Sequence, residues 1–291
     1  QQAKTMKPNA GAAALRTLIP LAIAVAIGLL LQKAIGPWWG PYSTRIMLDI
    51  GVAIILAVSL NIVNGYTGQF SIGHAAFMAA GGYVAGAITY YGSLFIWGDY
   101  VKVGGFLGTG EWMFFGACIV GGLVAAGLGW IVGLPSLRLR GDYLAIVTLG
   151  FGEIMRVLLQ NTNQQLFSID EVKEATWEEL IPPPLGAAQG FSDIPKYTNL
   201  FWVYLFVVIT LLFAYRLKQS STGRALLSIR EDEVAAQAMG VNLTKLKVRA
   251  FMLAAFFAGI AGGLVSISYS ISPSIGIEWT LKALIVIVLA G

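Results

Sequence analysis

The stretch Ser-Ile-Arg-Glu-Asp-Glu-Val-Ala-Ala-Gln-Ala-Met-Gly, residues 228–240, is a charged island between two apolar segments. Apolar residues dominate positions 200–217 before it and 249–270 after it. Each segment is close to the roughly 20 residues that a helix needs to cross the hydrocarbon core of a bilayer. The pattern predicts a membrane protein with a short, charged, helix-forming segment on one side of the membrane.

The composition of the whole chain also favours a membrane protein. Hydrophobic residues make up 57% of the 291 positions, charged residues make up only 12%, and glycine occurs 35 times. A soluble domain of this size would leave too much apolar surface in water. Other apolar runs predict further spans at 17–35, 44–63, 75–91, 112–134 and 142–160, and an eighth that begins near Leu281.

The expected fold is therefore an all-α polytopic membrane protein, a helical bundle of at least eight transmembrane spans. We expect residues 1–291 to form a single transmembrane domain. The chain begins with Gln rather than Met, which suggests a piece of a longer protein. The last span is still apolar at Gly291, so we expect the chain to be truncated at its C-terminus.

The charges of the loops predict the orientation, because cytoplasmic loops carry an excess of Lys and Arg. Lys4, Lys7 and Arg16 precede the first span without any acidic residue, which favours a cytoplasmic N-terminus. Counting spans from there makes 218–248 a cytoplasmic loop. The same count places the acidic segment 161–199 outside the cytoplasm as an extracytoplasmic loop.

The sequence offers little support for catalysis by this chain. It has no G-x-x-x-x-G-K-[ST] loop, so it cannot bind a nucleotide in that way. His74 is its only histidine, which excludes His-rich metal sites. Gly68 to Gly73 has the spacing G-x-x-S-x-G, one residue longer than a nucleophile elbow. We therefore expect no enzyme activity, no bound metal or cofactor and no nucleic-acid partner.

Polar residues and glycines gather between two of the expected spans. Unpaired polar groups in hydrocarbon cost several kcal/mol each, so these side chains must face protein or a wet cavity. Gly65, Gly68 and Gly73 would also interrupt a continuous helix. The pattern predicts an interrupted or re-entrant segment near 64–74 that lines a translocation path, and a tight cytoplasmic turn is the alternative. The polar residues are Asn61, Asn64, Gln69, Ser71 and His74.

A second polar group lies within the expected span 142–160. Glu153 and Arg156 are three residues apart, which lets them pair on one face of a helix. An ion pair within a membrane often has a functional role, but near the end of a span it can also serve as an anchor. Both interpretations stay open. Thr148 adds a further polar side chain to the same helix.

The charged island itself predicts a short helix from about Glu231 to Met239. Acidic residues lie at its start and Gly240 suits its C-terminal cap. Its alanines would let a partner surface approach closely, while Arg230 and the acidic residues could bond across the contact. The alternative is an amphipathic helix on the lipid headgroups, which the mixed charge disfavours.

Pairs of glycines four residues apart recur in three of the expected spans. Such pairs let two helices approach closely inside a membrane. They predict a compact bundle without indicating what passes through it. The pairs are Gly82 and Gly86, Gly129 and Gly133, and Gly259 and Gly263.

The spacing Ala235-Ala236-x-x-x-Gly240 resembles the E-A-A-x-x-x-G coupling helix of bacterial ABC importer permeases. Val234 stands at the glutamate position, and the Leu-Pro ending of that motif is missing. Residues 61–74, 141–153 and 230–263, three motifs in order, are similar to the LivM-type permease subunits of high-affinity branched-chain amino-acid transporters. The resemblance covers most of the chain from about residue 44 onward.

The resemblance implies a subunit of a heteromeric importer in the bacterial inner membrane. Its partners would be a homologous H-type permease, two cytoplasmic ABC ATPases that use ATP and Mg, and a periplasmic or lipid-anchored binding protein. The substrates would be leucine, isoleucine and valine, moved by alternating access. The residues expected to couple to the ATPases are Arg230, Glu231, Asp232, Glu233, Ala235, Ala236 and Gly240.

The same family implies a translocation path with small and aromatic walls and few polar groups. The residues expected on this path are Asn61, Asn64, Tyr66, Gln69, Ser71, His74, Tyr143, Thr148 and Glu153. A urea or short-amide permease of the same superfamily is the nearest alternative, because it shares the glycine-rich motif and the coupling segment. A stand-alone channel or an ion-coupled carrier is a more distant alternative.

Overall fold

The computed structural model of the protein describes residues 10–99, 101–136, 142–268 and 270–290. Within these ranges the regular structure is helical, as the sequence predicts, and the only β-pairing consists of isolated bridges. The elements in chain order are α1 (Ala10–Leu30), the π-helix η1 (Leu31–Ile35), α2 (Gly36–Thr67), α3 (His74–Trp97), α4 (Thr109–Ser136), α5 (Asp142–Gln160), α6 (Ile169–Glu174), α7 (Trp177–Leu180), the 3-10 helix η2 (Ala187–Gln189), α8 (Leu200–Gln219), α9 (Ser221–Glu231), α10 (Glu233–Ala238), α11 (Leu243–Ser266) and α12 (Ile275–Ala290).

Five described helices are long and apolar enough to cross a membrane. The prediction of at least eight spans is therefore not confirmed over the described residues. A shorter apolar helix at Ala22–Lys33 lies where the first span is expected. The five membrane-length helices are Gly40–Thr67, Thr109–Leu134, Tyr143–Gln160, Leu200–Gln219 and Leu243–Ser266.

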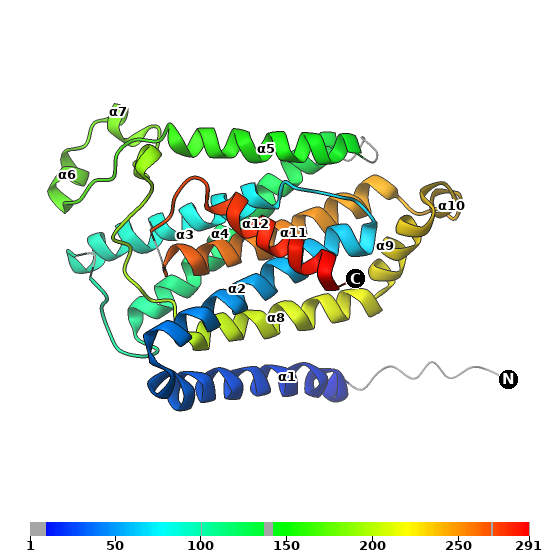
Figure 1. Ribbon diagram of the computed structural model, residues 1–291, viewed down its shortest axis with the longest axis horizontal. Helices are drawn as coiled ribbons and strands as arrows, with labels where there is room; N and C mark the ends of the chain where they lie inside the picture. Colours follow the sequence, from blue (N-terminus) through cyan, green and yellow to red (C-terminus); the bar gives the residue numbers. More distant parts are fainter. Residues whose placement is uncertain (1–9, 100, 137–141, 269, 291) are drawn as a thin grey trace.

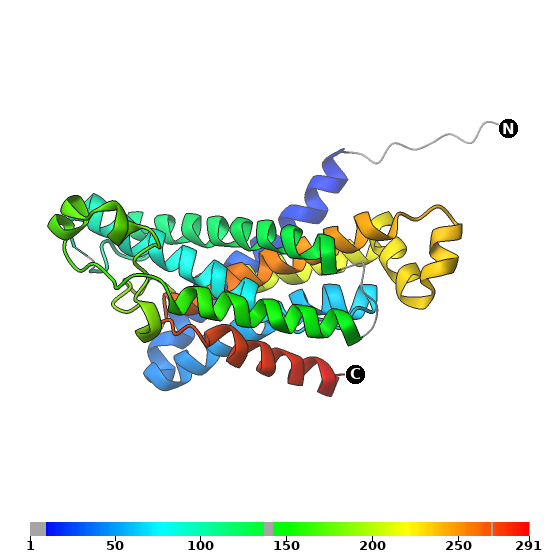
Figure 2. The same cartoon turned by 90° about the horizontal axis from the view of Figure 1, so that it is seen from above.

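The long helices lie side by side along the longest axis of the molecule (Figures 1 and 2). The helix α11 is central: it packs against α2, α3 and α4, and 78% of its apolar window is buried. The helix α5 lies at the edge, where it packs against α3 and α4, and only 22% of its window is buried. A spanning helix with so little cover presents most of its surface to lipid or to a partner.

Glycines set the close approach of α3 to α11. A Cβ atom added to Gly81 would lie 2.3 Å from the Cα atom of Gly259. One added to Gly262 would lie 1.9 Å from the carbonyl oxygen of Met78. Gly82 also faces α11, since its Cβ would lie 3.1 Å from the carbonyl oxygen of Gly262. The small residues thus bring two backbones into contact, as the predicted glycine pairs suggest.

The two ends of the bundle carry different structures. The short helices α6 and α7 lie at one end, and α9 and α10 lie at the other (Figures 1 and 2). In the first of these regions Ser168 and Glu171 form a capping box at the start of α6. An antiparallel bridge between Phe191 and Ile271 ties the same region to the segment before α12. The helices α6 and α7 were not predicted from the sequence.

Candidate functional site

The chain reverses direction between α2 and α3 without a regular turn. Residues 68–73 are not helical, and Gly68 has a φ of +68°, which only glycine adopts readily. His74 then begins α3 with its Nε2 atom 2.8 Å from the Oγ atom of Ser59. Ser59 lies eight residues before the end of α2, which is about 12 Å along a helix. The segment therefore re-enters the bundle, and Figure 1 shows it running back from the end of α2.

Side chains of α2 and α5 hold this re-entrant segment, residues 68–73, in place. The Ser71 backbone N–H donates to Oδ1 of Asn64 at 3.3 Å. The Ile72 backbone N–H donates to Oγ1 of Thr148 at 3.2 Å. Gly73 lies against Thr148 so closely that an added Cβ would be 2.9 Å from that residue's Cβ. Irregular backbone within a membrane protein is tolerated where protein groups satisfy it in this way.

The predicted path residues divide into a buried and an exposed set. Gln69, Ser71, His74 and Thr148 are buried at 7% exposure or less. Within the part of the chain that the structure describes, the Ser71 hydroxyl has no hydrogen-bond partner. The break predicted near 64–74 is present, but the cluster around it is closed within this single chain.

Of the remaining predicted path residues, Asn64 contacts this cluster through the Ser71 N–H, whereas Asn61, Tyr66 and Tyr143 lie outside it. Asn61 is exposed, and Tyr143 at the start of α5 is 71% exposed. Tyr66 is partly buried and donates its hydroxyl to the carbonyl oxygen of Ala214 in α8 at 3.2 Å. Its bond to α8 gives it a structural contact away from Ser71 and Thr148.

The predicted ion pair on α5 is present. The Nε atom of Arg156 donates to both carboxylate oxygens of Glu153, at 3.0 and 2.9 Å. The Glu153 side chain is 51% exposed, so the pair lies on the outward surface of α5. Two paired charges in an apolar span are poorly suited to a surface that faces hydrocarbon. This surface suits contact with water or with another polar protein surface.

The charged island forms two helices rather than one. The sequence predicted a helix from Glu231 to Met239, but α9 ends at Glu231 and α10 spans Glu233–Ala238. The chain breaks at Asp232 because its carboxylate accepts hydrogen bonds from the Val234 and Ala235 N–H groups, at 2.8 and 3.1 Å. That residue is the N-cap of α10.

The C-terminal end of α10 follows the prediction for Gly240. Met239 is the C-cap, and Gly240 comes next with a φ of +85°. A residue in the left-handed region just after a helix is usually glycine.

The sequence predicts that the alanines of α10 face a partner protein, and this prediction is wrong for Ala236. Ala236 is only 4% exposed, so it packs against its own chain. Ala235 is exposed, as are the larger side chains of Val234 and Met239, at 67% and 85%. The free surface of α10 is therefore more apolar and bulkier than the sequence suggests.

Two ionic or polar contacts fix the island to the bundle. Glu233 pairs with Lys247 of α11, whose side chain is 4% exposed. The guanidinium of Arg230 donates through Nη1 to the carbonyl oxygen of Gly65 at 3.0 Å. Its aliphatic stem lies against Gly68, where an added Cβ would be 3.1 Å from the Arg230 Cγ. Arg230 thus connects α9 to the end of α2, where the re-entrant segment begins.

One buried charge was not identified from the sequence. Glu111 of α4 is 1% exposed and accepts hydrogen bonds from the Trp202 indole at 2.9 Å, the Asn199 amide at 3.0 Å and the Leu107 backbone at 3.1 Å. Lys102 lies 3.6 Å away. The donors come from two distant parts of the chain, so no local pattern indicates them. Glu111 joins the loop before α4 to the start of α8.

Among the described residues, no group of three or more His, Cys, Asp or Glu side chains is placed to hold a metal ion. The polar residues of the two regions instead bind each other and the backbone. The two regions are therefore places where separate elements contact each other: the re-entrant segment contacts α2 and α5, and α9 and α10 contact α2 and α11.

Comparison with known proteins finds relatives that are named as permease proteins of transport or import systems. The chain is 34% identical over 235 residues to the protein named high-affinity branched-chain amino acid transport system permease protein LivM of Salmonella typhimurium. The LivM protein of Escherichia coli matches to the same extent. These alignments cover 73% of this chain and 49% of each relative, so the chain spans about half of their length.

A more distant relative from the same organism is the permease protein LivH of Escherichia coli, which is 24% identical over 81% of this chain and 74% of LivH. No solved structure shows a significant match. The family described as branched-chain amino acid transport system / permease component matches residues 42–291. That match covers most of the chain, and the chain therefore belongs to this permease family.

Proposed function

We propose that this chain is a membrane-spanning permease subunit of an ATP-driven importer of leucine, isoleucine and valine. The observation that carries the proposal is the family match over residues 42–291, together with 34% identity to proteins named as high-affinity permeases for branched-chain amino acids. The chain itself performs no catalysis in this proposal. ATP and Mg are bound by partner ATPases.

The proposal includes two kinds of subunit beside this one. A homologous permease of the LivH type would complete the membrane part, and a periplasmic or lipid-anchored binding protein would deliver the substrate. The outward surface of α5 is the best place for the second permease. It is poorly covered by its own chain, and it carries the Glu153–Arg156 pair in an otherwise apolar span.

The translocation path would then run between the two permeases, beside the re-entrant segment. Tyr143, Thr148 and Glu153 all lie on α5, and Thr148 also holds Ile72. Movement of α5 would therefore move the segment 68–73. An apolar amino acid needs a route with few polar groups, and its charged ends can bind the polar backbone of such a segment.

Coupling to the ATPases would occur through α9 and α10. The exposed side chains of Val234, Ala235 and Met239 offer a contact surface for the ATPase. A movement of α9 would reach the end of α2 through the hydrogen bond from Arg230 to the Gly65 carbonyl oxygen. In this scheme the chain crosses a bacterial inner membrane at least eight times, with a cytoplasmic N-terminus. The positive residues near α9 and α10 support a cytoplasmic location for that end.

The proposed substrate is tested by uptake of radiolabelled leucine and urea into cells that lack the subunit. Re-supply of the full-length protein should restore ATP-dependent leucine uptake and leave urea uptake unchanged. Restored urea uptake without leucine uptake would show that the substrate is urea and not a branched-chain amino acid. Leucine uptake that persists without the partner ATPases would instead indicate a carrier or a channel.

The proposed coupling is tested by Arg230→Ala, with Arg224→Ala as its control. Both arginines are exposed, but the Arg224 guanidinium donates to the nearby carbonyl oxygen of Gln219, five residues away, rather than to α2. We expect Arg230→Ala to lower leucine uptake about tenfold while ATP hydrolysis by the assembled complex continues. An equal effect of the two variants on uptake would contradict transmission through Gly65.

A further inference from the structure

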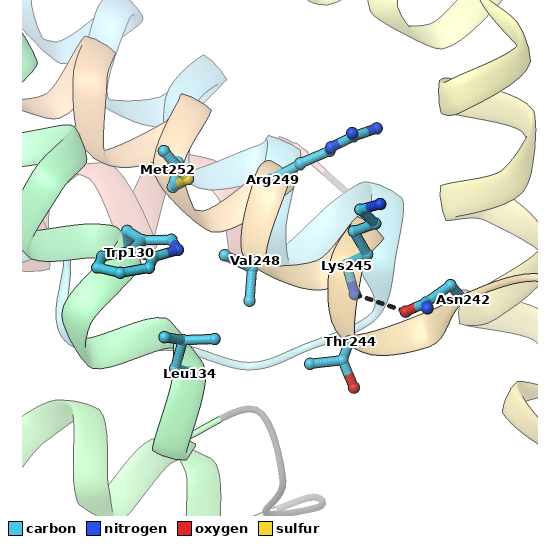
Figure 3. A pocket seen from close by; sticks show the side chains of 8 residues that line it. All are labelled: Trp130, Leu134, Asn242, Thr244, Lys245, Val248, Arg249 and Met252. Carbon is cyan, nitrogen blue, oxygen red and sulfur yellow. Dashed lines mark hydrogen bonds between the residues drawn. The ribbon is translucent and has the colours of Figure 1, made fainter.

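A cavity of about 590 Å³ lies between the end of α4 and the start of α11. Figure 3 shows Trp130 and Leu134 of α4 facing Val248 and Met252 of α11 across it. Lys245 and Arg249 line the same cavity. It is apolar on one side and cationic on the other. It lies at the end of the bundle that carries α9 and α10, and no step of the proposed transport cycle uses it.

Among the described residues, the two basic residues form a positive site without an acidic partner. They are four residues apart on α11, and Figure 3 shows that their side chains leave the helix on the same side. No acidic residue lies in the first turn of α11, where the helix dipole already places positive charge. Like charges at this spacing repel each other, and an anion held between them removes the repulsion.

A neighbouring lysine, in contrast, has an acidic partner within the chain. Lys247 is buried and forms an ion pair with Glu233. Over the residues described, neither Lys245 nor Arg249 has a carboxylate partner, and both are exposed. Their charge is therefore available to an anion from outside the chain.

An exposed apolar stripe on α4 leads away from this positive site. Together with the exposed Gly127, its residues recur at helical spacing along a helix that is long enough to span the membrane. From first to last the stripe is roughly 21 Å long, which exceeds one leaflet's share of a hydrocarbon core of roughly 30 Å. The side chains are Val120, Leu123, Val124, Trp130, Ile131 and Leu134, exposed by 40% to 59%.

We infer that this cavity binds an anionic phospholipid of the cytoplasmic leaflet. Lys245 and Arg249 hold the phosphate, and an acyl chain lies along the stripe on α4. Trp130 belongs to the stripe and also lines the cavity, and aromatic side chains favour the membrane interface. Basic pockets between spanning helices on this side of a membrane suit lipid headgroups. A free phosphate ion would use the two basic residues and leave the stripe without a role.

The test measures lipid binding to the full-length protein, purified in a neutral detergent, by native mass spectrometry. Phosphatidylglycerol and phosphatidylcholine of equal chain length are titrated separately. The double variant Lys245→Gln/Arg249→Gln keeps a polar, flexible side chain at both positions and removes their charge. We expect it to bind phosphatidylglycerol about tenfold more weakly than the unmodified protein, with no change for phosphatidylcholine.

The matched control is Lys218→Gln/Arg224→Gln. It removes the same charge from exposed residues at the same end of the bundle. We expect its affinity for phosphatidylglycerol to stay within about twofold of the unmodified protein, because these residues do not line the cavity. Equal loss in both double variants would overturn the site, since it would indicate only a general charge effect. Unchanged binding by Lys245→Gln/Arg249→Gln would overturn it as well.

Two further arms identify the source of the anion. If glycerol phosphate alone displaces phosphatidylglycerol at equal concentration, the acyl chain contributes nothing and the lipid assignment is wrong. A photoreactive residue at Ile131 in the assembled transporter should capture lipid. Capture of the second permease there would show a protein interface instead. Neither arm depends on the substrate or on coupling through Arg230, so the site can fail while the proposed function stands.

Discussion

At the scale of single residues, one hydroxyl group connects α5 to the re-entrant segment. Oγ1 of Thr148 accepts the Ile72 backbone N–H and donates to the Ala145 carbonyl oxygen. Thr148→Val keeps the shape of the side chain but leaves the partly buried Ile72 N–H without its acceptor. We expect it to lower stability by about 1 kcal/mol, measured by thermal unfolding in detergent.

Thr210→Val is the control for this prediction. Thr210 is fully buried, and its hydroxyl donates to the Phe206 carbonyl oxygen of its own helix. Both variants lose a bond within a helix, and only Thr148→Val also loses a contact between elements. Equal destabilisation by the two substitutions would mean that the Ile72 contact adds nothing.

Glu111 gives a second prediction at this scale. Its carboxylate accepts three hydrogen bonds from donors on α8 and on the loop before α4. In Glu111→Gln an amide NH₂ must face one of those donors. We expect a loss of about 2 kcal/mol in stability, seen as a lower unfolding temperature. Glu178→Gln on the exposed surface of α7 should have no such effect, and a similar shift in both would refute the prediction.

These two residues also show what the sequence can reveal. Thr148 was among the predicted site residues because a polar side chain in an apolar span needs a partner in the protein or in a wet cavity. Glu111 was not, because its partners Asn199 and Trp202 are about ninety positions away in the chain. A buried carboxylate is recognisable from sequence only when its donors are local.

At the scale of elements, glycine contact between α3 and α11 governs packing. Gly262→Ala would place a Cβ 1.9 Å from the Met78 carbonyl oxygen, which is backbone and cannot rotate away. The two helices must separate, at a cost of about 1–3 kcal/mol. We expect a lower unfolding temperature and a reduced yield of folded protein.

Gly127→Ala is the matched control on α4. Nothing lies within 4 Å of the added Cβ, and alanine favours a helix more than glycine does. We expect this variant to be as stable as the unmodified protein or slightly more so. Tolerance of Gly262→Ala at the same level would show that α3 and α11 are not in fixed contact.

The elements near the charged island were predicted only in part. The sequence indicated a short helix that ends before Gly240, and α10 does end there. It did not indicate the break at Asp232, because Glu231, Asp232 and Glu233 all suit the first turn of a helix. Which of them caps the helix depends on the packing of α9 against α2 and α8, and on the pairing of Glu233 with Lys247.

At the scale of the whole molecule, the arrangement of the ends makes a strict prediction about topology. The helices α6 and α10 lie at opposite ends of the bundle (Figure 1). If the long helices cross the membrane, these two helices must lie on opposite sides of it. From the distribution of Lys and Arg we expect the acidic loop that contains α6 outside the cytoplasm and the basic region around α10 inside it.

Single cysteines at two exposed positions test this topology. Lys173 lies on α6 and Gln237 on α10, and both are exposed. The natural Cys118 is buried, so it should contribute little background. In intact cells an impermeant maleimide should label Lys173→Cys, whereas Gln237→Cys should react only after the membrane is permeabilised. The reverse pattern would mean that the protein has the opposite orientation in the membrane, in which α10 could not contact a cytoplasmic ATPase. Labelling of both positions from one side would mean that the bundle does not cross the membrane along its long axis.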